Sequence, residues 1–201
     1  MNRSVFAVVV ALTWMLVFAS AARAQDPQPA RPPEFLTPPV QMLTAPLPPA
    51  TKLEAFQPAT GSVVTIGFDE LGRVQGISVD AREMRDAHGT LVRGLVVHVA
   101  ESERHQQVSF VDEDEIQDLL KGFDALLDVR GNPTTFRNFE VQYATRGELV
   151  LTVFNTPSGA ILFAVQAGRP VTARRAGLST AEMLRLRGMF EVAAQKLGPL
   201  K

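Results

Sequence analysis

The chain of 201 residues contains no cysteine, and its 20 basic and 21 acidic side chains nearly balance. The missing thiols exclude a disulfide framework, a thiolate metal site, a cysteine nucleophile and an acylated cysteine. The charge balance argues against a nucleic-acid-binding domain, which relies on many lysine and arginine side chains to neutralise phosphates.

The first 24 residues have the layout of a secretory signal peptide. Arg3 is followed by an apolar run and then by small residues up to Ala24, so cleavage is expected between Ala24 and Gln25. If it were left uncleaved, the apolar run is long enough to anchor the chain in a membrane. Cleavage removes Arg3 and Arg23, which leaves 18 basic and 21 acidic side chains and a formal charge of −3. The sequence therefore predicts an exported protein, periplasmic or secreted.

Residues 25–52 are predicted to be a proline-rich linker. Nine of the 26 residues from Gln25 to Ala50 are proline. Proline fixes its own backbone angle and restricts the preceding residue, so this segment should be extended and unable to join a sheet or a helix. Pro-x-x-Pro segments can also be ligands for aromatic grooves, which is the alternative interpretation. Residues 53–201 are long enough for a single domain with its own core.

Eight short strands are predicted in residues 53–201, in two groups of four. Alternating apolar residues indicate them at 64–68, 74–79, 95–99, 108–110, 139–143, 149–153, 161–165 and 171–175. Short turns separate neighbouring strands within each group, for example Asp69–Gly72 and Gly168–Pro170. Strands joined by such short turns should pair antiparallel. A helix is predicted after each group.

The first of these helices is predicted to begin in the acidic run Asp112-Glu113-Asp114-Glu115. Asp112 in the cap position and Glu115 three residues later form the signature of a capping box. The alternative is a metal or catalytic site, in which two or three of these carboxylates meet His105 or a distant partner. Because consecutive helical residues point in different directions, convergence from this run alone is difficult. The helix start is therefore the preferred interpretation.

The same capping signature returns 67 residues later, at Ser179 and Glu182, where the second helix is predicted to begin. The offset also aligns four pairs of apolar residues: Val111 with Leu178, Ile116 with Met183, Leu119 with Leu186 and Phe123 with Phe190. The sequence thus predicts an α+β fold with antiparallel sheets, built from a duplicated unit of four strands and a helix. A barrel closed by a terminal helix is the alternative fold.

No catalytic, cofactor-binding or metal-binding residue is predicted. The three histidines lack a ligand spacing such as His-Glu-x-x-His, and neither a serine-nucleophile motif nor a phosphate-binding loop occurs. Arg169, Arg174 and Arg175 form the one compact basic group, just before the second helix. They are explained as charges that protect a short edge strand, or as a weak interaction site for an anion or a partner.

One stretch of the chain resembles exported bacterial proteins of no assigned function. The resemblance is carried by Phe110–Ile116, Leu119–Phe123, Asn138–Glu140 and Tyr143–Thr145, and it covers roughly residues 53–197. It implies a shared fold and supplies no active-site residue. The repeated four-strand-plus-helix units also resemble the Whirly-type arrangement, in which two such units bind single-stranded nucleic acid. The alternative barrel is similar to pleckstrin-homology domains.

Together these features predict an exported, non-enzymatic binding or structural module of the cell envelope. Its partner is expected to be a protein or another envelope component, and no cofactor is expected. Contact with a membrane is expected only through an uncleaved leader. A metal-dependent hydrolase that uses residues 112–115 is the first alternative, and a nucleic-acid-binding module is the second.

Overall fold

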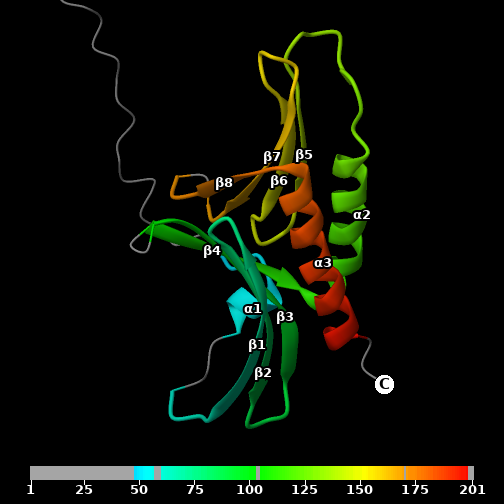
Figure 1. Cartoon of the computed structure of the whole chain (residues 1–201). Helices are drawn as coiled ribbons and strands as arrows, with labels where there is room; N and C mark the ends of the chain where they lie inside the picture. The colour runs from blue at the N-terminus through cyan, green and yellow to red at the C-terminus, as the bar shows by residue number, and fades with distance from the viewer. Residues whose placement is uncertain (1–47, 57–59, 103–104, 170, 199–201) are drawn as a thin grey trace, which may run out of the picture. The chain divides into compact units, whose positions relative to one another are not determined.

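The computed structural model describes residues 48–56, 60–102, 105–169 and 171–198, which belong to one compact unit, Pro46–Lys201. The expected leader and the expected linker up to residue 47 lie outside the described residues. Figure 1 shows two antiparallel four-stranded sheets, each followed along the chain by a helix. The predicted α+β class is confirmed, and the arrangement fits a duplicated unit. Because the two sheets do not close on each other, the barrel alternative is wrong.

Sheet A contains β1 (Val64–Val74), β2 (Ile77–Asp86), β3 (Leu91–Ser102) and β4 (His105–Asp112), in that order. The turn expected at 69–72 is not a turn, because these residues continue β1 through a bulge after Glu70. The chain reverses instead at Gln75 and Gly76, whose φ angles are 45° and 75°. Two residues with positive φ suit the tight hairpin turn that joins twisted strands.

Sheet B contains β5 (Glu140–Ala144), β6 (Val150–Asn155), β7 (Ile161–Ala167) and β8 (Arg174–Leu178), in that order. β8 is an edge strand, but it begins at Arg174 and not at the expected Val171. The backbone N–H of Thr172 donates to the carbonyl of Arg169 at 2.9 Å, which holds the chain in a turn before the strand.

Two long helices, α2 (Ile116–Leu127) and α3 (Thr180–Leu197), lie side by side and pack against the sheets, and a short helix, α1 (Lys52–Ala55), precedes β1. A single 3-10 turn, η2 (Glu113–Glu115), leads into α2. α2 follows sheet A but packs on β5 and β6, whereas α3 follows sheet B but packs mainly on β1 and β2. Each helix therefore covers the sheet of the other unit.

One hydrophobic core unites both sheets and both long helices. Leu95 and Val97 enter it from sheet A, and Leu151 and Val153 enter it from sheet B; all four are fully buried. The rings of Phe123 in α2 and Phe190 in α3, which the 67-residue offset aligns, lie 5.2 Å apart between centroids. Equivalent residues of the two units thus meet at the centre of the fold. Among the described residues, no helix is both long enough and apolar enough to cross a membrane.

Candidate functional site

Asp112 does not cap the helix that follows it, so the predicted capping box of Asp112 and Glu115 is wrong. Asp112 is the last residue of β4, and its side chain is 1 % exposed. Its carboxylate accepts hydrogen bonds from the backbone N–H groups of Lys52 at 2.9 Å and Leu53 at 3.1 Å. The residue therefore satisfies the first amides of α1, a helix about 60 residues away in the sequence.

Glu115 and Asp114 bind Arg146, in the turn between β5 and β6. The Arg146 Nε lies 3.1 Å from the Glu115 carboxylate, and the Arg146 backbone N–H donates to the same carboxylate at 2.9 Å. Asp114 accepts hydrogen bonds from Arg146 and from Lys52. Burial acts to raise the pKa of Asp114, but these two cations outweigh burial and hold the pKa below its ordinary value.

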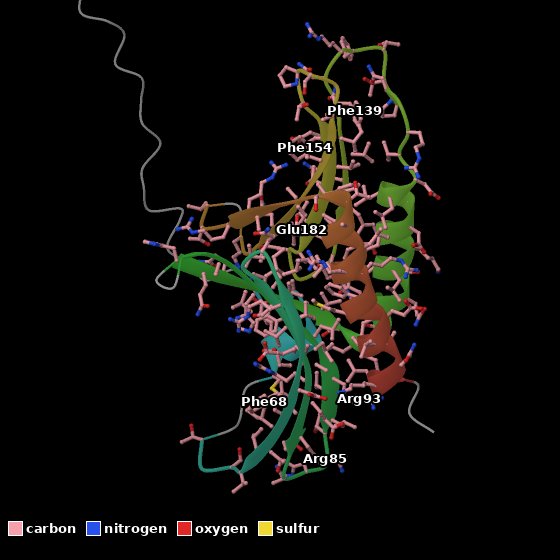
Figure 2. All side chains as sticks on the ribbon, in the orientation of Figure 1. Phe68, Arg85, Arg93, Phe139, Phe154 and Glu182 are labelled. Carbon is pink, nitrogen blue, oxygen red and sulfur yellow. The ribbon has the colours of Figure 1, made fainter. Side chains whose placement is uncertain are left out.

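The fourth acidic residue, Glu113, binds Arg93 of β3 through two hydrogen bonds of 2.8 Å and 3.0 Å. Arg93 also donates to the carbonyl of Gly198, at the end of α3. Figure 2 shows Arg93 on the side of sheet A that faces this helix. The acidic run thus ties β3, α1, α3 and the β5–β6 turn together.

Among the described residues, the acidic run does not form a cluster of side chains that could hold a metal ion. His105 begins β4 and Asp112 ends it, so the two are separated by the length of the strand, about 23 Å at the usual rise per residue. The guanidinium of Arg146 takes the place beside the carboxylates that a metal ion would need. Each carboxylate of the run is bound by cations or amides of the chain itself.

The three arginines of the basic group do not form one site. Arg169 pairs with Glu54 of α1 at 3.2 Å. Arg175 lies on the outer side of sheet B, with its guanidinium 5.2 Å from the centre of the Phe154 ring. Arg174 and Arg175 point to opposite faces of β8, as strand geometry requires. Of the three, Arg169 alone lines the cavity described next.

A cavity of about 420 Å³ lies where the two sheets meet, and we name it the junction cleft. Its walls come from the chain before α1, from α1, from β4, from the β5–β6 turn and from the β7–β8 loop. The lining residues are Pro48, Ala50, Glu54, Gln107, Val108, Phe110, Gly147, Glu148, Gly168, Arg169 and Thr172. Four segments that are distant in the sequence, residues 48–54, 107–110, 147–148 and 168–172, therefore meet around one space.

Two close approaches between the sheets build the floor of the junction cleft. Phe110 of β4 forms a single bridge with Gly147, and a Cβ at Gly147 would lie 1.8 Å from the Phe110 carbonyl oxygen. The backbone N–H of Gly168 donates to the buried hydroxyl of Ser109 at 3.1 Å. Glycine is required at position 147 because a side chain would push the sheets apart.

Two of the charged groups of the junction cleft, Glu54 and Arg169, are held in defined positions, and the backbone at Glu148 is strained. Glu54 accepts hydrogen bonds from Arg169 at 3.2 Å and from the backbone N–H of Ala50 at 2.7 Å. Glu148 has a φ of 61°, which non-glycine residues rarely adopt and which costs on the order of 1 kcal/mol. Such strain persists only where the surrounding structure imposes it, and it is concentrated at functional sites. The cleft thus combines fixed charges, an amide and the apolar side chains of Val108 and Phe110.

Sequence reasoning found only part of this site. Arg169 is one of the predicted interaction candidates, and the turn at Gly168 is predicted from its composition. Glu54, Gln107 and Glu148 carry no local signal, because each belongs to a different segment and only the packing of the sheets brings them together.

The fold and the cleft define a class: a two-sheet α+β module made of two units of four strands and a helix, with a polar cleft where the sheets meet. No protein-family model matches the chain, and no curated protein matches it.

Proposed function

We propose that this protein is an exported, non-enzymatic binding module of the cell envelope that holds a partner in the junction cleft. The observation that carries the proposal is the meeting of Glu54, Gln107, Glu148 and Arg169 around one cavity of about 420 Å³. Concave sites with a few convergent polar groups are the usual places for ligand binding. The leader and the proline-rich linker support export and a position away from a surface.

The cleft chemistry favours an extended peptide segment of another envelope protein as the partner. Gln107 offers an amide that can both donate and accept, which suits a peptide backbone. In the Glu54–Arg169 pair, each side chain is about one-third exposed, so both can contact a polar side chain of the partner at the rim of the cleft. Val108 and Phe110 add apolar area on the same wall.

Two hydrogen bonds hold Glu54 in a fixed position in the cleft. One carboxylate oxygen accepts from Arg169 and the other accepts from the backbone N–H of Ala50. The carboxylate therefore presents a negative charge at a defined place on the wall of the cleft, where it can accept a further hydrogen bond from a partner.

Neither alternative function is favoured by a specific observation in the described residues. A hydrolase that uses residues 112–115 would have to displace Arg146, Lys52 and Arg93 before an ion could bind. A nucleic-acid-binding module would need an excess of basic residues, whereas the chain without its leader has a formal charge of −3.

Site-specific photo-cross-linking in cells tests the proposal. A photoreactive amino acid at Gln107 is expected to capture a second protein, whereas the same amino acid at Ala125, an exposed position on α2, is not. Arg169→Ala should reduce the Gln107 adduct at least about tenfold, the change expected from losing one important contact. Equal capture at both positions, or an adduct that survives Arg169→Ala, would contradict the proposal.

Chelation separates the binding module from the metal enzyme. The melting temperature of the purified protein should be the same with and without EDTA, because the carboxylates of the acidic run are stabilised by cations of the chain itself. A structural or catalytic ion would add stability that chelation removes. A clear fall in melting temperature with EDTA would favour the hydrolase.

A further inference from the structure

β1 is an edge strand of sheet A and exposes a row of large apolar side chains. Ile66 is 54 % exposed and Phe68 is 74 % exposed, and Val63, just before the strand, is 76 % exposed. Ile66 and Phe68 are two residues apart and so lie on the same face of the strand. Figure 2 shows Phe68 on the side of the sheet that faces away from α3. The described helices thus leave this apolar row uncovered.

The edge itself is open to pairing over a short, defined stretch. Within the described residues β1 pairs only with β2, so one of its two edges has unpaired backbone N–H and C=O groups. The register with β2 is continuous from Val64 to Glu70 and is then broken by the bulge. A bulge disrupts the ladder locally. The stretch that can add a further strand is therefore Val64–Glu70.

We propose that two copies of this protein associate by antiparallel pairing of their β1 strands, with the two-fold axis at Gly67. In this register Ile66 of each copy lies opposite Phe68 of the other, a β-branched and aromatic pair of the kind that stabilises sheets. The pairing joins the two A sheets into one continuous eight-stranded sheet. A closed two-fold interface of this kind is self-complementary.

The charges of the stretch favour this orientation. Asp69 and Glu70 are its only charged residues, and both lie at one end. Antiparallel pairing about Gly67 places Asp69 opposite Thr65 of the second copy and Glu70 opposite Val64, so no acid faces another acid. Parallel pairing would put the acidic ends of both strands side by side, which is unfavourable.

The interface is independent of the junction cleft. β1 and β4 are the opposite edges of sheet A, and the cleft lies against β4. A dimer through β1 therefore leaves both clefts open and presents two binding sites on one particle. Two linked sites bind a repeated or surface-anchored partner more strongly than one site does.

Disulfide trapping in this cysteine-free chain tests the register. Gly67 and Gly177 are matched strand glycines, since both are exposed and a Cβ at either meets no atom within 4 Å. In the full chain, Gly67→Cys is expected to form an intermolecular disulfide on mild oxidation, because its counterpart lies directly across the axis. Gly177→Cys on β8 should remain monomeric on a non-reducing gel. Equal trapping at both positions would overturn the proposal.

Sedimentation tests the interface without a covalent bond. The purified protein should sediment as a dimer, and Phe68→Lys should weaken the dimer at least about tenfold because the interface loses both of its Ile66–Phe68 apolar pairs. Leu184→Lys replaces another exposed apolar residue, on α3, and should leave the dimer unchanged. A melting temperature equal to that of the parent verifies that each variant is folded. A monomer at about 0.1 mM, or a dimer that resists Phe68→Lys, would refute the proposal.

Discussion

Asp112 places a polar side chain in the interior of the protein. Its side chain is 1 % exposed, and its two oxygens accept the N–H groups that begin α1. Arg146 adds a longer-range contact, 3.7 Å from one of these oxygens. A buried carboxylate is tolerated when its oxygens are satisfied in this way. The same bonds attach residues 50–56 to sheet A and thereby place Glu54 at the junction cleft.

We expect Asp112→Ala to lower the free energy of unfolding by about 1–3 kcal/mol, because it leaves two amides without an acceptor. Urea unfolding followed by circular dichroism measures the change. Asp128→Ala, at an exposed position after α2, should change stability by less than about 0.5 kcal/mol. Similar losses in the two variants would show that the Asp112 carboxylate has no special role.

Glu182, at the start of α3, has a lowered pKa that makes the stability of the protein depend on pH. Hydrogen bonds from the Ser179 backbone, the Gln75 side chain and the Ser179 hydroxyl lower the pKa of Glu182 from 4.5 to about 2. Because the folded state binds this proton less readily than the unfolded state, the ionised carboxylate stabilises the fold above pH 4.5. That contribution is lost as the pH falls from 4.5 through about 2.

Glu182→Gln should therefore lower the melting temperature at neutral pH but have little effect near pH 2. Thermal unfolding of the parent and the variant between pH 2 and pH 7 measures this difference, which should shrink as the solution becomes more acidic. Ser179→Ala removes a hydrogen-bond partner of the same carboxylate and should show the same trend. A difference that is constant across the whole range would contradict the assignment.

The starts of the two long helices differ, although their sequences look alike. Ser179 and Glu182 form the full capping box at the start of α3, as predicted. At the start of α2 the equivalent residues are bound elsewhere, Asp112 to α1 and Glu115 to Arg146. The η2 turn, which includes Glu115, stands between Asp112 and the helix. A capping signature is local, but a stronger distant partner can take its side chains.

The glycines inside the two helices also serve different purposes. A Cβ at Gly122 in α2 would lie 2.6 Å from the ring of Tyr143, so glycine lets the helix approach β5 closely. A Cβ at Gly188 in α3 would meet no atom within 4 Å. Glycine in a helix interior costs about 1 kcal/mol relative to alanine. At Gly122 the close packing against Tyr143 offsets this cost. At Gly188 no neighbouring atom is close enough to require glycine, so the cost is not offset.

Gly122→Ala and Gly188→Ala should therefore change stability in opposite directions. We expect Gly122→Ala to destabilise the protein by about 1–3 kcal/mol through overpacking against Tyr143. Gly188→Ala should stabilise it by about 0.5–1 kcal/mol through helix propensity. Urea unfolding of both variants measures the effects. Stabilisation by both changes would mean that α2 does not lie against Tyr143 as closely as the structure shows.

At the scale of the whole molecule, the two units exchange helices across one core. α2 covers sheet B and α3 covers sheet A, so neither unit contains both a sheet and the helix that covers it. The ion pair between Asp124 of α2 and Arg187 of α3, at 2.6 Å, and the contact of Phe123 with Phe190 join the helices directly. The fold is therefore expected to form as one cooperative unit.

A fragment of residues 46–131 should not unfold cooperatively as a monomer, because the apolar face of sheet A would be exposed without α3. Circular dichroism with a urea titration tests this expectation. Mixing the fragment with its complement, residues 132–201, should restore the cooperative transition of the intact chain. A 46–131 fragment that is monomeric and unfolds cooperatively would show that the first unit is self-sufficient.

The sequence by itself determined the elements that depend on neighbouring residues. Alternating apolar residues predicted two groups of four strands, the capping signatures predicted the start of a helix after each group, and the 67-residue offset predicted a duplicated unit. The capping box of Ser179 and Glu182 was also predicted, because its two residues are only three positions apart in the sequence. In contrast, the turn expected at Asp69–Gly72 was wrong, since a bulge continues the strand through residues that usually form turns.

Only the tertiary structure decided how these elements use their polar side chains. Asp112 meets the N–H of Leu53 across 59 residues, and Arg169 meets Glu54 across 115 residues. No local pattern predicts these pairings, because they arise from the packing of α1 against the end of β4 and against the β7–β8 loop. Hydrophobic periodicity specifies which face of an element is buried, whereas the partner that buries it is set by the packing of the whole chain.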